Sequence, residues 1–458
     1  MKKGMIIALT LALTAISAWA QDTPEEPKEI NLTLQERELV DSNNDFAFKL
    51  FRKARTEENK VLSPLSVTMA LGLANNGAAG QTQQEICNTL GFGDAGADAI
   101  NVFCHKMMTE GSHLDPKTKV NMANTIFVNL PRELLPDFVQ KANEYYDAQP
   151  QSRDFADGET MDVINQWASD HTEGMIPIVL TEETFNPDAA SYLLNAIYFK
   201  GEWVTKFDKE NTKDEPFDGG QVVPMMLQEA ELPYTTTETC QAVKLPYGNK
   251  AYDMTVLLPL EGKTVADVLA QLDGERWSQL AQEMQATDII LKLPRFETET
   301  DQGLKDIMSE LGMPSAFNPF TADFSNFCTT NPYISHMKQN AKIQVDEEGS
   351  VAAAVTVIGY SNSVIESVPF IANRPFLYII SEQSTGVIFF IGQYMGPGDP
   401  SKPNIEDPTG IESSPIAHPS PLTPVYDLQG RRISPLTPHS LSLKKGLYVT
   451  QGRKFVIK

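Results

Sequence analysis

The segment from Val351 to Ile358 constrains the fold of this chain most, because its composition and its surroundings point in opposite directions. It combines β-branched residues with small ones, which favours a strand. Turn-forming and polar residues flank it, with Asp346–Gly349 before it and Gly359–Ser363 after it, as around an exposed loop. One interpretation reconciles the two signals: a loop in one state of the protein that becomes a strand in another.

The size of the side chains supports this interpretation. Strand alternation places every second residue on one face. On one face these residues are mostly small: Ser350, Ala352, Ala354, Thr356 and Ile358. Such a face can enter between existing strands without a steric clash, and Gly349 supplies a pivot with a free φ angle. An ordinary surface loop or edge strand fits the same spacing equally well, so the spacing leaves both interpretations open.

The rest of the chain places helices first and sheets later. Apolar residues recur at helical spacing over Ala47–Ala54 and over Leu304–Leu311, which indicates amphipathic helices. The apolar runs Phe376–Ile380 and Val387–Ile391, joined by a polar turn, indicate buried strands. This order favours an α+β fold.

Composition divides the 458 residues into segments. The first twenty have a charged start, an apolar run and the small-x-small ending Ala18-Trp19-Ala20, which predicts a cleaved signal peptide and a secreted or cell-surface protein. The run is too short and too often broken by hydroxyl residues for a membrane anchor. The segments are a signal peptide (1–20), a flexible lead-in (21–38), a main domain (39–397), a Pro/Ser-rich linker (398–424) and a strand-like tail (425–458).

Charge and motifs exclude several classes of function. A formal net charge of -23 makes nucleic acid and anionic membranes poor partners. The sequence has no HExxH, GxSxG or P-loop motif, and no His at metal-ligand spacing, so we expect no enzyme activity, no metal and no cofactor. Carboxylate pairs are abundant, but nothing singles one out as a glycosidase pair. We expect free buried thiols, with one oxidised pair as the alternative, at Cys87, Cys104, Cys240 and Cys328.

The main domain resembles the serpin family over about Leu39 to Pro397. The motifs occur in the family's order: Val61–Ser66 with Gly77–Thr82, Asn124–Phe127, Ile164–Trp167 with Thr172, Leu194–Trp203, Leu293–Phe296, Asn373–Phe376 and Phe389–Gly392. The resemblance implies a serpin fold, with three β-sheets, about nine helices and an exposed reactive-centre loop. It implies a monomeric serine-type endopeptidase inhibitor that acts as a suicide substrate. A protease cuts the loop and is trapped as an acyl-enzyme while the hinge inserts into the main sheet.

The hinge implied by the resemblance includes the segment discussed first. It consists of Glu347, Glu348, Gly349, Ser350, Val351, Ala352, Ala353, Ala354, Val355 and Thr356. Small residues on its inserting face favour an inhibitor over the alternative, a non-inhibitory serpin that acts as a carrier, chaperone or protease substrate. Val351 and Val355 depart from the family pattern, but both lie on the face opposite Ser350.

The resemblance also implies a region that controls the opening of the main sheet. It consists of Ser63, Ser66, Asn195, Trp203 and Gln339. Gln339 stands where the family often has a His in a polar cluster with Ser63 and Asn195. Because an amide both donates and accepts hydrogen bonds, we expect this cluster to survive.

The reactive bond can be placed by two counts. The usual family spacing from Glu347 gives Ser363-Val364, and the count back from Pro375 gives Val364-Ile365. The counts differ because the loop is one residue longer than the commonest length. Both put a small or β-branched residue before the cut.

Such a residue suits a protease with a shallow apolar specificity pocket, which predicts elastase-like or subtilisin-like targets. Tyr360–Phe370 contains no Lys or Arg, which argues against a trypsin-like target. Heparin-type activation needs a basic helix, and Asn101–Lys119 has few basic residues, so we expect no such activator.

The tail resembles the C-terminal sorting segments of exported Bacteroidetes proteins. The similar pieces are Tyr426–Arg432 and Lys444–Val449. The alternative is a small extension without a role in export.

Overall fold

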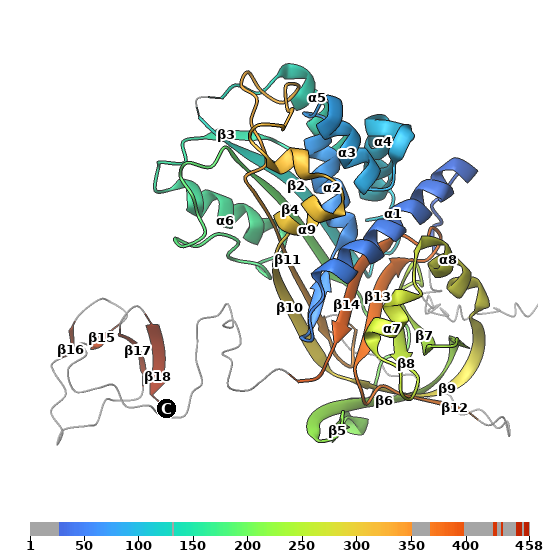
Figure 1. Ribbon diagram of the computed structural model, residues 1–458. Helices are drawn as coiled ribbons and strands as arrows, with labels where there is room; N and C mark the ends of the chain where they lie inside the picture. Colours follow the sequence, from blue (N-terminus) through green and yellow to red (C-terminus); the bar gives the residue numbers. More distant parts are fainter. Residues whose placement is uncertain are drawn as a thin grey trace, which may run out of the picture.

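The computed structural model describes residues 27–130, 132–349 and 367–397, together with the short strands of the tail at 425–427, 432–433, 446–450 and 453–457 (Figure 1). The predicted signal peptide and the predicted linker lie outside these residues.

Nine α-helices lie in the described residues, as the resemblance implied. They are α1 (Leu34–Ala54), α2 (Pro64–Asn75), α3 (Gly80–Thr89), α4 (Gly96–Thr109), α5 (Pro136–Tyr146), α6 (Thr160–His171), α7 (Val265–Ala270), α8 (Gly274–Glu283) and α9 (Lys305–Leu311). Three short 3-10 helices accompany them: η1 (Gly93–Ala95), η2 (Lys209–Asn211) and η3 (Pro314–Phe317). The helices predicted over Ala47–Ala54 and Leu304–Leu311 are confirmed as parts of α1 and α9.

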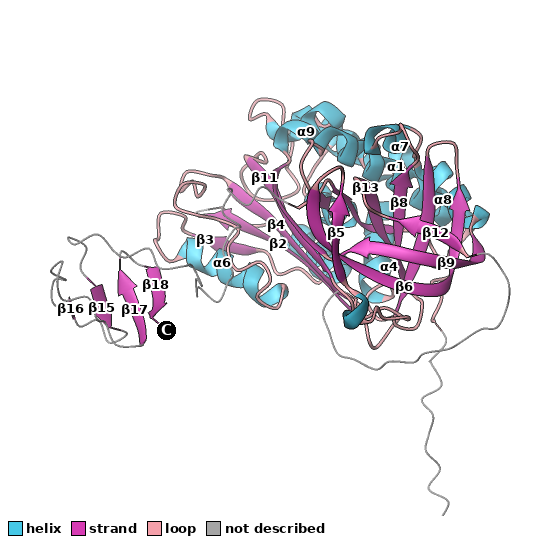
Figure 2. Cartoon of the chain, turned by 90° about the horizontal axis from the view of Figure 1, so that it is seen from below, coloured by secondary structure: helices cyan, strands magenta, loops and turns pink. Residues whose placement is uncertain are grey.

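A five-stranded sheet, here called the main sheet, has the strand order β10-β11-β4-β2-β3. Its strands are β2 (Lys119–Asn129), β3 (Gln151–Arg153), β4 (Ser191–Lys200), β10 (Phe296–Gly303) and β11 (His336–Val345). Helix α6 contacts β2 and β4, and Figure 2 shows it beside the part of the sheet that contains β2, β3 and β4.

A nine-stranded sheet has the order β1-β14-β13-β8-β7-β6-β9-β12, with β5 also paired to β6. Its long strand β6 pairs with β9 over Met225–Tyr234 and with β7 over Tyr234–Thr236. It therefore joins the strands β9 and β12 on one side to the strands β7, β8, β13, β14 and β1 on the other. The strands are β1 (Lys60–Leu62), β5 (Lys213–Phe217), β6 (Gln221–Thr236), β7 (Cys240–Tyr247), β8 (Tyr252–Pro259), β9 (Gln285–Pro294), β12 (Val368–Ile371), β13 (Phe376–Glu382) and β14 (Ile388–Tyr394). The two halves of this sheet, the main sheet and the nine helices together form the predicted α+β fold.

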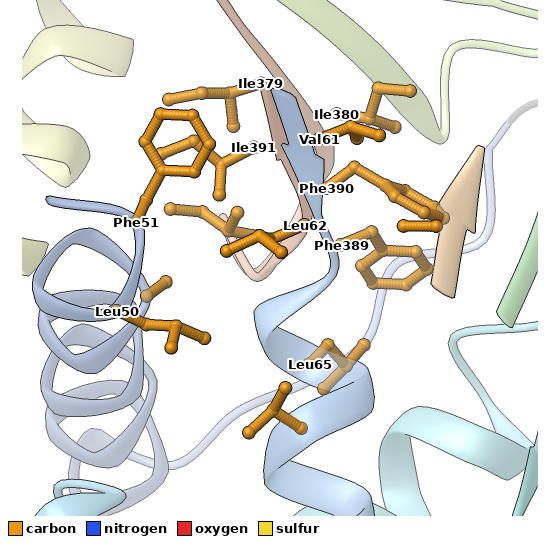
Figure 3. Close-up of a cluster of buried hydrophobic side chains, with 14 of the residues drawn as sticks. Leu50, Phe51, Val61, Leu62, Leu65, Ile379, Ile380, Phe389, Phe390 and Ile391 are labelled. Atoms are coloured by element: carbon orange, nitrogen blue, oxygen red, sulfur yellow. The ribbon is translucent and has the colours of Figure 1, made fainter. Parts of the chain in front are cut away.

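The core lies where α1 and α2 pack against β1, β13 and β14 (Figure 3). Helix α2 is buried over its whole length, which explains why its sequence is apolar almost all round. The Ser63 hydroxyl caps it by accepting a hydrogen bond from the Ser66 N–H (3.3 Å), and Pro64 occupies the first turn. The predicted strands Phe376–Ile380 and Val387–Ile391 are confirmed in β13 and β14, which are buried throughout.

The prediction of a flexible lead-in over residues 21–38 is wrong for its last part. Helix α1 already begins at Leu34, because Thr33 and Glu36 form a reciprocal capping box. Ile30 is buried, and its N–H donates to the Ser384 hydroxyl (2.9 Å). The acidic composition suggested a loose segment, but the cap fixes the start of the helix.

All four cysteines are free and buried. Burial raises the pKa of the Cys104 thiol to about 12, so this thiol stays protonated at neutral pH. Among the described helices, none combines the length and the apolar character needed to cross a membrane.

The tail forms a four-stranded antiparallel sheet with the order β16-β15-β17-β18. Its strands are β15 (Val425–Asp427), β16 (Arg432–Ile433), β17 (Gly446–Thr450) and β18 (Arg453–Ile457). All four strands lie within the tail that the sequence analysis describes as strand-like.

Candidate functional site

The two central strands of the main sheet, β4 and β11, run parallel but pair over only two residues each. His336 and Met337 pair with Tyr192 and Leu193. Beyond Leu193 and Met337, the described residues of β4 and β11 do not pair with each other. On their outer edges, β4 stays paired to β2 up to Lys200, and β11 stays paired to β10 up to Val345. The facing edges therefore form a slot in the sheet, and an unpaired strand edge is a template for a further strand.

The chain turns at the far end of this slot, directly after β11. The Asp346 N–H donates to the Gly349 carbonyl (3.0 Å), and Gly349 forms an antiparallel bridge with Glu202, just past the end of β4. Gly349 has a φ of 137°, and a Cβ atom there would lie 2.2 Å from the Gly201 carbonyl oxygen. Only glycine fits this close approach. A strand that continued from Gly349 in this direction would run antiparallel to both β4 and β11.

Trp203 fixes this turn. Its backbone N–H donates to the Glu348 carbonyl (3.0 Å), and its ring Nε1–H donates to the Asp346 carbonyl (2.9 Å). The indole stacks on Tyr247, with the ring centroids 4.3 Å apart. The predicted residue Trp203 thus lies at the open end of the slot, where it holds the turn from which the hinge begins.

The two hinge carboxylates are buried against basic side chains. Glu347 accepts a hydrogen bond from the Thr212 hydroxyl (2.8 Å), and Arg295 lies 3.6 Å from it. Glu348 pairs with Lys209 and lies 3.7 Å from the Lys206 ammonium. The hydrogen bond from Lys209 lowers the pKa of the Glu348 carboxyl, so this hinge carboxylate is charged at neutral pH.

The polar cluster predicted around Gln339 is formed in part. The Gln339 amide accepts from the Ser63 N–H (3.1 Å) and donates to the Ser63 carbonyl (2.8 Å) and the Ser66 hydroxyl (3.2 Å). These bonds tie β11 to the start of α2.

Asn195 departs from the expected cluster. Its amide donates to the Asn124 side chain (2.7 Å) on the neighbouring strand β2 and not to Ser63. Asn195 does line the same small cavity as Ser66 and Gln339. The expectation of one cluster that includes Asn195 is therefore wrong for its hydrogen bonds, because the Asn124 side chain on β2 accepts the bond from the Asn195 amide.

The remaining predicted residues lie outside the described part of the chain. These are the hinge from Ser350 to Thr356 and the reactive-bond residues Ser363, Val364 and Ile365. The described chain resumes before β12, which pairs in parallel with β9. The segment that holds the reactive bond is thus fixed at one end by the turn at Gly349 and at the other by β12.

Sequence reasoning missed the basic partners of the hinge. Lys206 and Lys209 follow the motif Leu194–Trp203 closely, but they lie far from Glu348 in the sequence. Their closeness to that motif was the available signal. Within the described ranges, no group of three or more His, Cys, Asp or Glu side chains can hold a metal ion.

Comparison with known proteins places this geometry in a family. The profile described as "Serpin (serine protease inhibitor)" matches residues 41–397. The leukocyte elastase inhibitor of Xenopus tropicalis is 32% identical over 77% of this chain and 97% of that protein. Among solved structures, the native state of the thermophilic serpin Tengpin matches with a TM-score of 0.74 and 29% identity, over 81% of this chain and 97% of that one. Human thyroxine-binding globulin matches with a TM-score of 0.71 and 25% identity, over 78% and 98%.

Proposed function

Because the chain belongs to the serpin family, we propose that it inhibits serine-type endopeptidases as a suicide substrate. The observation that carries this proposal is the slot between β4 and β11, which opens directly beside the hinge turn at Gly349. The chain supplies no catalytic residue to the reaction. It supplies a cleavable bond and a sheet that lacks one strand.

The proposed reaction begins when the serine hydroxyl of the protease attacks the carbonyl carbon of the reactive bond. The peptide bond breaks, the new amine leaves on the C-terminal fragment, and an ester joins the serine to the residue before the cut. The hinge is then free at its C-terminal end and enters the slot. The protease moves with the hinge, and its active site is distorted before water can hydrolyse the ester.

Insertion is favourable because the edges of β4 and β11 gain backbone partners. An antiparallel strand can bond to both edges along the slot. Each backbone hydrogen bond contributes about 1 kcal/mol net, so a strand paired on both sides gains several kcal/mol. The small side chains of Ser350, Ala352, Ala354 and Thr356 suit a strand that must pass between packed neighbours.

The proposed reactive bond is Ser363-Val364 or Val364-Ile365, and the proposed targets are elastase-like or subtilisin-like proteases. Both candidate bonds place a small or β-branched residue before the cut. The name of the Xenopus relative, an inhibitor of leukocyte elastase, supports the same class of target.

No heparin-like activator is part of the proposal. On α4 the only Lys or Arg is Lys106, which pairs with Glu36 (2.7 Å) and donates to the Asn31 carbonyl (3.0 Å). A polyanion would have to compete with these contacts.

We also propose export. The charged start and apolar run of residues 1–20 support a secreted or cell-surface location. The tail supports a sorting role, because strands β15 and β17 of its antiparallel sheet overlap the two pieces that resemble sorting segments.

A second candidate function is a non-inhibitory carrier. The similarity to thyroxine-binding globulin favours it, since that protein's name states a binding function. Small hinge residues argue against it, because a carrier has no need to insert its loop.

The test is incubation of the chain without residues 1–20 with elastase, subtilisin, chymotrypsin and trypsin. A denaturing gel and the mass of the released C-terminal fragment are the readouts. We expect a covalent complex with elastase or subtilisin, and a fragment that begins at Val364 or Ile365. Cleavage by every protease without a complex would overturn the inhibitor proposal and favour the carrier.

A matched pair of hinge variants makes this test specific. Ala354→Arg places a charge on the inserting face, and Ala353→Arg places the same charge on the opposite face. We expect Ala354→Arg to be cleaved without forming a complex, while Ala353→Arg keeps most of its complex. Equal behaviour of the two variants contradicts the proposed register of insertion.

A further inference from the structure

A cavity of about 390 Å³ lies at the closed end of the slot, between the main sheet and the segment that follows α6. Its volume falls in the range of about 300–1,000 Å³ that is typical of ligand pockets. The sheet side of its wall includes Leu193 and Met337, which belong to the paired residues of β4 and β11. The other side includes Ile176, Val179 and Leu180.

Hydrogen bonds hold the wall that covers the sheet. Asn165 on α6 accepts from the N–H groups of Val179 and Leu180 (both 2.9 Å) and donates to the Leu180 carbonyl (2.8 Å). Lys338 on β11 donates to the Val179 carbonyl (3.4 Å) from across the cavity. The segment that covers the sheet is therefore tied to both α6 and β11, which is typical of a preformed site.

The ionisable side chains that line the cavity are mostly basic, although the chain as a whole is strongly acidic. Lys305, His336 and Lys338 lie on the side of α9 and β11, and Glu183 is the acidic residue of the lining. Lys338 pairs with Asp301 (2.7 Å), whereas Lys305 forms no ion pair with any described residue. Within the described part of the chain, Lys305 is thus a cation without a counter-ion, beside an apolar cavity.

The lining also contains a buried acceptor without a donor. The side-chain oxygen of Asn195 is buried and receives no hydrogen bond from the described residues. Burying such a group without a partner costs free energy, so a ligand with a hydroxyl or amide donor would gain from meeting it.

We propose that this cavity binds an amphipathic organic anion. Its apolar body lies among Ile176, Val179, Leu180, Leu193 and Met337, and its acid group lies at Lys305 and His336. A hydroxyl group on the ligand can donate to Asn195. The chemistry is that of a monocarboxylate or sulfonate with an aliphatic or aromatic body.

Because of its position, a ligand in this cavity affects the opening of the main sheet. A ligand that contacts both β4 and β11 where they pair holds the two strands together, so it opposes the separation that a full insertion requires. This consequence rests on the proposed inhibitor mechanism, whereas binding itself does not.

Isothermal titration of the chain without residues 1–20 tests the binding. The probes are dodecanoate and dodecyltrimethylammonium, which share one tail and differ in charge. We expect one saturable equivalent of dodecanoate and markedly weaker binding of the cation. Val179→Trp fills the cavity and should abolish binding. Lys305→Glu should weaken dodecanoate by about tenfold or more, since it reverses a charge beside the acid group.

Lys263→Glu is the matched control, because Lys263 is exposed in the loop before α7 and does not line the cavity. It should bind dodecanoate within about twofold of the unaltered chain, which corresponds to well under 1 kcal/mol. The absence of saturable binding overturns the proposal, as does equal affinity for the cation or an equal effect of the two charge reversals. Should Val179→Trp fail to fold, as judged by its thermal unfolding, the two lysine variants decide.

The protease gel run on the same sample separates the two proposals. A covalent complex without dodecanoate binding contradicts the cavity proposal alone. Dodecanoate binding without a complex contradicts the inhibitor proposal alone.

Discussion

Two pairs of strands in this molecule contrast in how completely they are joined. Strands β13 and β14 pair along almost their whole length, and every residue in them is buried. Strands β4 and β11 lie at the centre of the main sheet, yet they pair over two residues each. The first pair is a finished core, and the second leaves room for a strand. One domain therefore contains both a well-packed core and a sheet that is open to a further strand.

The largest effect should come from completing the main sheet. Cleavage of the loop, by any protease that cuts between Tyr360 and Ile365, should raise the melting temperature by about 10 °C or more, because several kcal/mol of pairing are gained. Differential scanning calorimetry before and after cleavage measures the shift.

The two hinge variants provide the control. Ala354→Arg should be cut without the shift, and Ala353→Arg should keep most of it. No shift after cleavage of the unaltered chain would mean that the slot does not accept the hinge.

Damage to the finished core should be large and independent of the state of the loop. Phe390→Ala removes a fully buried ring from β14 and should cost about 3–5 kcal/mol of unfolding free energy. Because we expect this core to stay unchanged on insertion, intact and cleaved protein should lose the same amount in urea titrations. A loss restricted to the intact form would show that the two regions are coupled.

Loosening the hinge should have a smaller effect, and only on the intact form. Glu348→Gln removes the charge that pairs with Lys209 and should cost about 1–3 kcal/mol. The turn at Gly349 is then held less firmly, so the variant should lose inhibitory activity faster on storage at 37 °C. The residual complex-forming fraction, followed over days by gel, measures this loss.

The pH dependence of this contact has a defined sign. The folded-state pKa of Glu348 is lowered from its ordinary value of 4.5, so its stabilising contribution is fully present above that value. The contribution is lost as the pH falls through the lowered pKa. The difference in melting temperature between the unaltered chain and Glu348→Gln should therefore be constant above about pH 5 and shrink below about pH 4. A difference that persists unchanged at about pH 3 would assign the effect to shape and not to charge.

The finished core could be predicted from the sequence, and the slot could not. The apolar runs in β13 and β14 predict buried strands by local pattern. The capping residues Thr33 and Glu36 were also readable in the sequence, but the acidic composition around them favoured a flexible segment. Strand β4 carries the same kind of apolar run as any buried strand. Whether its edge is paired depends on where β11 diverges, which no local pattern records.

The candidate site follows the same division. The resemblance placed Gln339 in a polar cluster with Ser63 and Asn195, and Ser66 in the same sheet-opening region. The structure brings Ser63, Ser66 and Gln339 together. Residues that act through distant contacts were missed, such as Lys209, which meets Glu348 from a different part of the chain. Asn195 was placed in the wrong hydrogen-bond group, because its partner Asn124 becomes a neighbour only through the register of β2 and β4.

The smallest effect should come from Gln339→His, near the closed end of the slot. Gln339 joins β11 to α2 through one accepted and two donated hydrogen bonds. A neutral imidazole keeps one donor and one acceptor, so we expect a change in stability of less than about 1 kcal/mol. Gln339→Leu keeps the size but leaves the buried Ser63 N–H without its acceptor, while the Ser63 carbonyl keeps only its bond from the Val67 N–H, so the change should cost about 1–3 kcal/mol. Urea unfolding of the intact chain ranks the two variants. If Gln339→His costs as much as Gln339→Leu, the shape of the amide, and not its hydrogen-bonding capacity, holds β11 in place.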